Sequence, residues 1–370
     1  MNNLVLYRKY RPMNFSEFIG QEHIVKTLTN ALRSNQTSHA YILSGPRGTG
    51  KTTIARVLAK AINCANRKQG EFEPCNKCSS CLEINEGRAL DLVEIDAASN
   101  RGIDEIRELK ERIRFTPVKS KYKVFIIDEA HQLTKEAANA LLKTLEEPPS
   151  HAVFILATTE IHKMIPTIIS RCQRFDFKKF GLEDLIKQLK FVSQQEKIKI
   201  DSEAIEVIAF NSEGSLRDAI SLLDECVIFS GSLGDEKIGK QDIENLLGLV
   251  DTTIIVKFVD LLFEKKEKEA LNFIDNMIEK GFDLDDFSKK TVEYLRKAMI
   301  LKINPELKKS FLIGMGDEDI EKLKKQISGL TIEEIKKIVY ILIDASKEMR
   351  YSSFYQLPLE LAVVEICDKN

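Results

Sequence analysis

Two short stretches near the N-terminus carry residue types that bind phosphate and metal ions. The string GPRGTGKT (45–52) has the spacing G-x-x-x-x-G-K-[ST], in which backbone amides and a lysine surround phosphate oxygens. It lies between an apolar run and a helical pattern, the context that the motif requires. The alternative is a glycine-rich turn that binds nothing. The predicted nucleotide contacts are Gly45, Pro46, Arg47, Gly48, Thr49, Gly50, Lys51, Thr52 and Thr53.

Within this loop, Lys51 is expected to reach the β- and γ-phosphates, and the Thr52 hydroxyl to ligate Mg²⁺. The string KVFIIDEAH (123–131) supports this prediction, because its apolar residues deliver Asp128 and Glu129 to the carboxyl end of a strand. Asp128 would hold Mg²⁺, and Glu129 would act as the general base on water. The alternative is an acidic strand end that caps the next helix.

Three further short strings supply candidate residues for the same site. LATTE (156–160) ends a predicted strand at Thr158 and Thr159, where one hydroxyl would orient water or sense the γ-phosphate. SRCQR places Arg171 in a loop after a proline-containing turn, where it would stabilise transition-state charge. GSLRD places Arg217 just after a glycine at a helix start, within reach of a γ-phosphate. The alternatives are a strand-end threonine, an exposed arginine and a capping ion pair.

Cys64, Cys75, Cys78 and Cys81 form the second stretch, CANRKQGEFEPCNKCSSC. Four thiolates suit tetrahedral Zn²⁺ in a closed, structural site. An iron–sulfur cluster and free thiols are the alternatives. The segment has few apolar residues, so zinc would supply the energy that folds it. We therefore predict a zinc-stabilised surface insertion that takes no part in hydrolysis.

The elements that must position these residues are predicted from hydrophobic periodicity. In residues 1–180 short apolar runs alternate with helical patterns, which is typical of a parallel α/β sheet. After Phe180 the strand signals disappear and amphipathic helical patterns follow. The predicted strands are 40–44, 91–96, 123–128, 152–158 and 173–177, and the main helical segments are 50–63, 134–147, 181–196, 201–214, 214–230, 242–250, 252–281, 283–302, 317–329 and 331–350.

The fold class is therefore an α/β P-loop domain followed by two helical domains. The boundaries we predict are 1–179 for the α/β domain with the insertion at 64–81, 180–241 for a three-helix domain, and 242–370 for an all-helical domain. A glycine-rich stretch at 230–240 resembles a linker.

Composition fits a globular protein. The sequence is 43% hydrophobic and 30% charged, and its formal net charge is −2, so any DNA contact would need a local basic surface. The N-terminus lacks an apolar run long enough for a signal peptide, and no stretch is long enough to span a membrane. We expect a cytoplasmic protein.

Taken together, these motifs resemble one family. YRKYRP (7–12), FIGQEH (18–23), GPRGTGKT, the four cysteines, EIDAASNRGIDEIR (94–107), FIIDEAH, LLKTLEEPP (141–149), ATTE, SRC and GSLRD are similar, in the same order, to the gamma/tau subunits of bacterial DNA polymerase III clamp loaders. These are AAA+ ATPases. The resemblance covers residues 1 to about 220 by motif, and the remainder in length and helical type.

The resemblance implies roles for particular residues. Tyr7, Arg11, Pro12, Ile19 and Gly20 would line the adenine side. Thr159 would be the first sensor, and Arg217 the second sensor for the ATP of its own chain. Arg171 would be the arginine finger that reaches a neighbouring subunit's ATP.

The resemblance also implies a fold and partners. The domains would be an AAA+ ATPase domain, a lid and a collar that assembles the ring. The cofactors would be ATP, Mg²⁺ and Zn²⁺. The partners would be delta and delta-prime subunits, further copies of this chain in a hetero-pentameric ring, the sliding clamp and primer-template DNA. The chain would open the clamp and load it on primed DNA. Longer tau forms continue into polymerase- and helicase-binding domains, so we expect either a short, gamma-like form or part of a longer chain.

Three rival functions remain. A nonhydrolysing delta-prime-like subunit would not need Lys51, Thr52 and Glu129. A hexameric helicase would separate strands without a clamp. A scaffold would bind ATP as a structural ligand, and the Glu129→Gln variant would then release phosphate at an unchanged rate.

Overall fold

The structure is a computed structural model that describes residues 5–100, 102–229, 237–247, 252–304 and 317–368. Most of the predicted linker at 230–240 and the end of the predicted helix at 242–250 lie outside the described residues. The chain forms two compact units. One contains Met1–Lys199 and Ile208–Asp235, and the other contains Ile200–Val207 and Glu236–Asn370.

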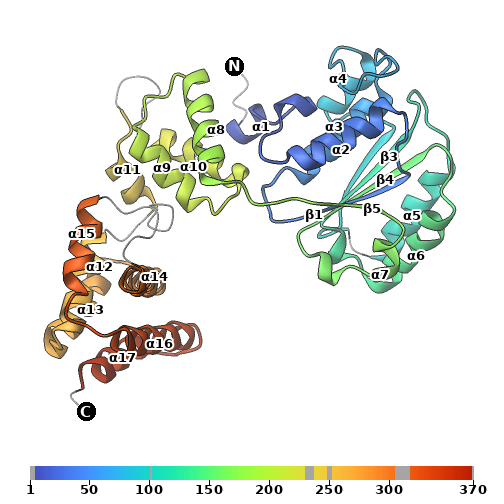
Figure 1. Ribbon diagram of the computed structural model, residues 1–370. Coiled ribbons are helices and arrows are strands. Elements are labelled where there is room, and N and C mark those ends of the chain that lie inside the picture. The colour runs from blue at the N-terminus through green and yellow to red at the C-terminus, as the bar shows by residue number, and fades with distance from the viewer. Residues whose placement is uncertain (1–4, 101, 230–236, 248–251, 305–316, 369–370) are drawn as a thin grey trace. The chain divides into compact units, whose positions relative to one another are not determined.

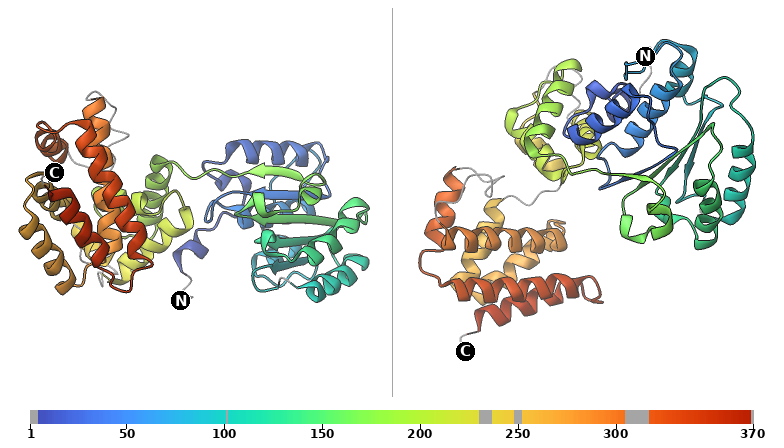
Figure 2. Two further views of the ribbon diagram at one scale, coloured as in Figure 1. Left: turned by 90° about the horizontal axis from the view of Figure 1, so that it is seen from below. Right: turned by 45° about the vertical axis from the view of Figure 1, so that its right-hand side comes forward.

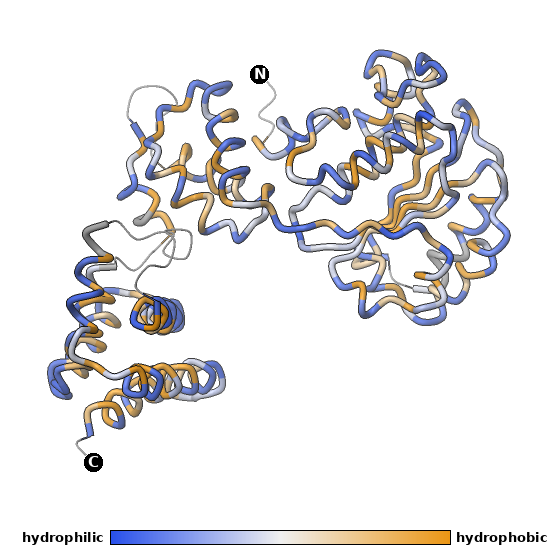
Figure 3. Tube along the Cα trace, in the orientation of Figure 1, coloured by the Kyte–Doolittle hydropathy of each residue, from blue (hydrophilic) through white to orange (hydrophobic). Residues whose placement is uncertain are grey.

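The first unit is built on a five-stranded sheet in the order β2-β3-β4-β1-β5, with every paired strand parallel. All five strand predictions and the parallel α/β fold are confirmed. The apolar strands form the orange centre of the unit in Figure 3, as expected where helices cover both faces of a parallel sheet. The strands are β1 (Ala40–Ser44), β2 (Leu92–Asp96), β3 (Lys123–Asp128), β4 (Ala152–Thr158) and β5 (Gln173–Asp176).

Helices lie on both faces of this sheet (Figures 1 and 2). Alternate residues of β1 show the division, because Tyr41 and Leu43 join the core formed with α2 and α3, whereas Ala40 and Ile42 join the core formed with α5, α6 and α7. The helices of the α/β part are α1 (Leu6–Lys9), α2 (Glu22–Arg33), α3 (Lys51–Asn63), α4 (Ser79–Asn85), α5 (Ile103–Arg114), α6 (Lys135–Glu146) and α7 (Pro166–Ile169), with single 3₁₀ turns at Phe15–Glu17, Ala130–Gln132 and Ile161–Lys163.

Helix boundaries follow the local chemistry of the sequence. Helix α6 begins after Thr134, whose side chain accepts a hydrogen bond from the Ala137 amide and so caps the helix. Helix α3 ends at Asn63, and the backbone of the next residue, Cys64, is extended. The first cysteine of the cluster therefore sits where the phosphate-loop helix stops. Three more helices follow the sheet: α8 (Leu182–Gln195), α9 (Ser202–Asn211) and α10 (Leu216–Phe229).

Asp91, directly before β2, fixes the loop that leads into β3. Its carboxylate accepts hydrogen bonds from the amides of Val118 (2.7 Å), Lys119 (2.9 Å) and Ser120 (2.8 Å). The residue is only 4% exposed. Burial alone would raise the pKa of Asp91, but these amide donors bring it below its usual value.

We expect Asp91→Asn to lower the free energy of unfolding of the first unit by about 2 kcal/mol near neutral pH. A depressed folded-state pKa stabilises the protein above the unfolded pKa, about 3.9 for Asp, and this contribution is lost as the pH falls through the folded pKa. Urea unfolding from pH 7 to pH 3 should therefore show the two proteins converging at the acidic end. Glu86→Gln, at an exposed ion pair, should change the stability by less than about 1 kcal/mol. A constant difference across this range would contradict the assignment.

The described part of the second unit is largely helical. It holds the first part of α9, up to Val207, and a single parallel bridge between Ile200 and Ile238. Its further helices are α11 (Lys240–Leu246), α12 (Thr252–Phe263), α13 (Glu267–Glu279), α14 (Leu284–Ile303), α15 (Asp317–Gln326), α16 (Ile332–Met349) and α17 (Leu357–Cys367). One apolar cluster joins α12 to α17. Thr331 and Glu334 form a capping box that starts α16.

One helical segment differs from the prediction. The segment 252–281 is two helices, because the chain turns through Lys265 in the left-handed region, with φ 53°. The stretch 264–269, EKKEKE, holds no apolar residue that could anchor a continuous helix to the core. In the described part of the chain, no helix combines the length and apolar character needed to cross a lipid bilayer.

Candidate functional site

The carboxyl ends of three strands meet beside the phosphate loop. Ser44 of β1 lies in register with Thr158 of β4, and the Gly45 amide donates to the Thr158 carbonyl at 3.1 Å. The Lys51 ammonium lies inside the loop and donates to the carbonyls of Gly45 and Pro46, each at 2.7 Å. Burial lowers the pKa of Lys51, and the nearby Glu129 and Asp128 carboxylates oppose that shift. A buried cation therefore faces two acids at the sheet edge.

Two glycines allow the backbone conformation of the phosphate loop. Gly48 and Gly50 have φ of 73° and 98°, a region that side chains other than glycine rarely adopt. A Cβ atom on Gly48 would lie 1.8 Å from Ser215 Oγ, just before α10. The loop and the start of α10 thus approach each other closely. Sequence reasoning missed Ser215, although it stands between Gly214 and Arg217 in the GSLRD string.

Thr52 and Asp128 are brought together as a pair. The Thr52 hydroxyl donates to Asp128 Oδ2 at 2.7 Å. A hydroxyl and a carboxylate at the first turn of the phosphate-loop helix form an oxygen donor set that suits Mg²⁺. The residues therefore fit the metal that sequence reasoning assigned to them.

Glu129 and Thr159 also meet. Glu129 lies in the left-handed region, with φ 46°, and its Oε2 accepts hydrogen bonds from the Thr159 hydroxyl (2.9 Å) and amide (3.3 Å). The backbone of Glu129 is therefore strained, and its carboxylate is oriented by the residue after β4.

His131 is a site residue that sequence reasoning missed. Its side chain is 3% exposed, its Nδ1 lies 3.0 Å from Thr158 Oγ1 and 3.5 Å from Glu129 Oε2, and its Nε2 lies 3.4 Å from Glu160 Oε1. The residue stands two places after Glu129 in the DEAH string. That closeness in sequence was the available signal.

The N-terminal segment borders the loop from another side. The Arg217 guanidinium lies over the Tyr7 ring, 4.9 Å from its centroid. Burial, followed by repulsion from Arg56, lowers the pKa of Arg11, and Glu94 opposes this. A Cβ on Gly20 would lie 2.9 Å from the Phe180 ring. Pro12 and Ile19 are half-buried in the same segment. The structure thus places Tyr7 against Arg217. A nucleotide site formed by both the N-terminal segment and α10 would require this contact.

Arg171 follows α7 and is held on the surface. Its guanidinium donates to Glu146 Oε1 (2.6 Å), to the Thr167 carbonyl (2.7 Å) and to Ser170 Oγ (3.2 Å). Its side chain is 32% exposed. These partners come from α6 and α7, not from the phosphate loop of the same chain.

The four cysteines converge into one group. Their Sγ atoms all lie within 4.8 Å of one another, so the group could hold a metal ion. The Cys75 amide donates to Cys64 Sγ at 3.3 Å, and the Lys77 and Cys78 amides donate to Cys75 Sγ at 3.4 and 3.2 Å. Burial alone would raise the pKa of Cys75, but the amide donors lower it to about 6. Burial raises the pKa of Cys64 and of Cys81, so it is the convergence of the four sulfurs, with amide donors orienting Cys75, that fits a metal site.

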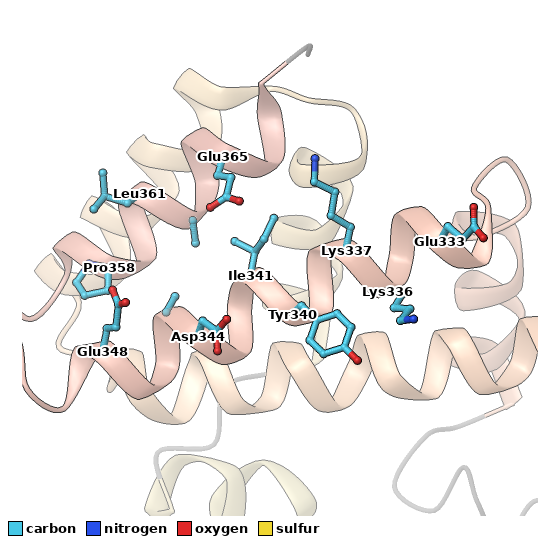
Figure 4. Close-up of a pocket in the computed structure, with 12 residues that line it drawn as sticks. Glu333, Lys336, Lys337, Tyr340, Ile341, Asp344, Glu348, Pro358, Leu361 and Glu365 are labelled. Atoms are coloured by element: carbon cyan, nitrogen blue, oxygen red, sulfur yellow. The ribbon is translucent and has the colours of Figure 1, made fainter.

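A separate groove of about 720 Å³ lies in the second unit, between α16 and α17. Ile341 and Leu361 line it together with charged side chains that include Lys337, Asp344 and Glu365 (Figure 4). It contains none of the predicted site residues. The predicted phosphate-binding residues Lys51 and Thr52 lie in the first unit.

The parallel sheet, the phosphate loop, the acidic strand end and the helices that follow define an AAA+ ATPase. Three family models match successive parts of the chain: DNA polymerase III, delta subunit (20–181), DNA polymerase III clamp loader subunit, ATPase lid domain (184–232), and DNA polymerase III subunits gamma and tau domain III (238–370). The matches follow one another along the chain without overlap.

Relatives that match over the whole of this chain carry names that agree with these family models. The chain is 35% identical to the DNA polymerase III subunit gamma of Buchnera aphidicola subsp. Acyrthosiphon pisum, covering 99% of both chains. It is 41% identical to the DNA polymerase III subunit tau of Bacillus subtilis, covering 100% of this chain and 64% of that protein. The chain therefore belongs to the gamma/tau family of DNA polymerase III clamp-loader subunits. It spans less than two thirds of the Bacillus relative's length.

Two solved structures are similar at lower identity. The Thermotoga maritima RuvB Holliday junction branch migration motor has a TM-score of 0.49 and 19% identity, covering 75% of this chain and 87% of that chain. The Bacillus subtilis DNA clamp loader delta protein has a TM-score of 0.39 and 16% identity, covering 91% of this chain and 98% of that chain.

Proposed function

We propose that this chain is the ATP-hydrolysing motor subunit of a DNA polymerase III clamp loader. Working with delta and delta-prime subunits and further copies of itself in the cytoplasm, it would use ATP to open the sliding clamp and place it on primer-template DNA. The observation that carries the proposal is the pairing of Thr52 with Asp128 and of Thr159 with Glu129 beside the Lys51 loop. Family membership supplies the choice of clamp loading among the activities of AAA+ proteins.

Each residue has a task in this proposal. Lys51 and the loop amides bind the β- and γ-phosphate oxygens, while Thr52 and Asp128 would hold Mg²⁺, which neutralises phosphate charge when bound. Glu129 accepts the proton of the water that attacks the γ-phosphorus, as the bond to the ADP oxygen breaks. Thr159 orients the Glu129 carboxylate. Arg217 acts on the nucleotide of its own chain.

Arg171 has a different task, because its present partners are on the surface of its own chain. We infer that it reaches the γ-phosphate bound by a neighbouring copy. Arg171 lies partly exposed at the surface and has one carboxylate partner, Glu146, which supports this role, since an ion pair at such a position is weak enough to open on assembly.

Replacing Lys51 tests the nucleotide site directly. Lys51→Ala removes the cation inside the loop, so ATP affinity should fall at least about tenfold. Equilibrium binding of ATP in the presence of Mg²⁺ measures this change. Lys26→Ala, on an exposed turn of α2, should bind ATP like the unaltered chain. Equal ATP affinity in the Lys51 variant would exclude the loop as the phosphate site.

The cysteine group is proposed as a structural zinc site. Four sulfurs at zinc-ligand distance from one ion would lie about 3.8 Å apart in a tetrahedron, so the observed group needs only a small contraction. Zinc bound by four thiolates has no open position, and it would hold the insertion folded without taking part in hydrolysis.

Metal content gives the expected result for this site. Chain purified without chelators should contain about one zinc ion per molecule, and Cys81→Ser should lose it, because three sulfurs remain. Elemental analysis measures zinc and iron together, so an iron–sulfur cluster would be recognised. Cys172→Ser alters a thiol outside the group and should keep the metal. Absence of stoichiometric zinc from the unaltered chain would contradict the proposal.

A further inference from the structure

The cysteine segment makes a set of hydrogen bonds that zinc ligation alone does not require. Glu73 accepts hydrogen bonds from the amides of Phe15 and Ser16, each at 2.8 Å. Asn76 donates to the Met13 carbonyl at 3.3 Å and to the Asn14 side chain. These contacts join positions about 60 residues apart in sequence. The insertion therefore holds the segment 13–16 through backbone groups at both of its ends.

Lys60 adds hydrogen bonds to the same contact between the insertion and the segment 13–16, which we call the junction. It is 2% exposed, and its ammonium donates to the Met13 carbonyl (2.9 Å), Asn76 Oδ1 (2.7 Å) and Asn85 Oδ1 (2.8 Å). The residue lies in α3, the helix that begins at Lys51 and ends at Asn63, directly before Cys64. A buried ammonium satisfied by three oxygens ties the phosphate-loop helix, the cysteine segment and the N-terminal segment together.

The held segment continues directly to the phosphate loop. Phe15 is 1% exposed within the core shared with α2 and α3. The Phe18 ring lies 3.4 Å from the place where a Cβ on Gly50 would stand. At the far end, Gln21 exchanges hydrogen bonds with the backbone of Lys178, at 2.8 and 3.2 Å. The stretch from 13 to 21 is thus fixed at both ends and passes against the loop in between.

The metal ligands lie within this junction. Cys75 stands between Glu73 and Asn76, and its sulfur accepts hydrogen bonds from the Lys77 and Cys78 amides. Asn76 adopts φ 52°, in the left-handed region that asparagine tolerates better than most other residues. A metal ion bound through Cys75 would fix the backbone that presents Glu73 and Asn76 to the N-terminal segment.

We propose that the cysteine insertion positions the adenine side of the nucleotide site, with Glu73 as the positioning residue. It acts through the amides of Phe15 and Ser16 and touches no nucleotide itself. The inference rests on the proposed nucleotide site and on one expectation from the family resemblance, namely that the segment with Ile19 and Gly20 lines the adenine. The inference predicts that breaking the hydrogen bonds of the junction lowers the affinity for the nucleoside part of ATP and leaves the affinity for the phosphates unchanged.

Comparing the binding of ATP with that of inorganic tripolyphosphate distinguishes the nucleoside contacts from the phosphate contacts. Glu73→Gln leaves one acceptor oxygen for two amides, so ATP affinity should fall about fivefold. Affinity for inorganic tripolyphosphate, measured with the same Mg²⁺ concentration, should stay within about twofold, because the Lys51 loop is untouched. Glu71→Gln is the matched control, since the Glu71 carboxylate accepts a hydrogen bond from the Lys68 amide, a partner inside the insertion. It should bind both ligands like the unaltered chain.

Hydrogen exchange tests the junction without any substitution. The Phe15 and Ser16 amides should exchange slowly in the metal-loaded chain and at least about tenfold faster after a chelator removes the metal. The metal-free chain should also show the selective loss of ATP affinity. Equal falls in ATP and tripolyphosphate affinity, or unchanged exchange at these amides, would overturn the inference. An unaltered chain that binds neither ligand would instead contradict the proposed function, while the exchange result would still decide whether the junction depends on metal.

Discussion

Glu129→Gln is expected to lower ATP turnover about 100-fold or more while ATP affinity stays within about twofold. The amide matches the carboxylate in size and can keep the hydrogen bond from the Thr159 hydroxyl, but it cannot accept a proton from water. Turnover should be measured as steady-state phosphate release, and affinity by equilibrium binding of ATP.

Glu136→Gln provides a matched control, because Glu136 lies exposed in the first turn of α6, close to Glu129 in sequence. It should hydrolyse ATP at the unaltered rate. If Glu129→Gln released phosphate at the unaltered rate, Glu129 would not be the base, and the scaffold alternative would regain support.

Arg171→Ala is expected to have the second large effect, and only in the assembled complex. An arginine finger contributes on the order of 10³-fold or more to phosphoryl transfer. If every hydrolysing site in the ring depends on Arg171 from a neighbour, turnover of the ring should fall at least about 50-fold. ATP affinity of the isolated chain should be unchanged, because Arg171 bonds Glu146 and Thr167 of its own surface there.

Arg174→Ala separates this effect from a loss of surface charge. Arg174 is exposed on β5 and pairs with Asp176 in the same strand. It should leave turnover of the assembled complex near the unaltered value. If Arg171→Ala reduced ATP binding by the isolated chain, Arg171 would act within its own subunit, contrary to our proposal.

Local sequence signals were enough to predict the sheet and the places of the main motifs. Buried strands of a parallel sheet are continuous apolar runs, so β3 and β4 could be recognised from KVFIID and AVFILAT. The phosphate loop and the cysteine cluster have fixed spacings, and the structure brings Thr52 to Asp128 and the four sulfurs together. The roles assigned to these residues stay predictions until they are measured.

Other features depend on contacts that leave no periodic signal. Glu73 lies 58 residues from its partner Phe15, and Asp91 lies 27 residues from Val118, so neither pairing can be read from a local pattern. His131 could have been suspected from its place beside Glu129, but its burial against Thr158 depends on the pairing of strands. The break at Lys265 reflects a backbone conformation that the helical pattern on either side conceals.

The central claim, that this chain couples ATP hydrolysis to clamp loading, is tested most directly by its steady-state ATPase rate in a mixture with delta and delta-prime subunits. The rate should be measured alone, with sliding clamp, with primed DNA, and with both. Our account predicts strong stimulation only when clamp and primed DNA are both present, and its loss in the Glu129→Gln and Arg171→Ala variants. A rate that is indifferent to clamp and DNA would contradict the account and leave an AAA+ ATPase whose work is something other than clamp loading.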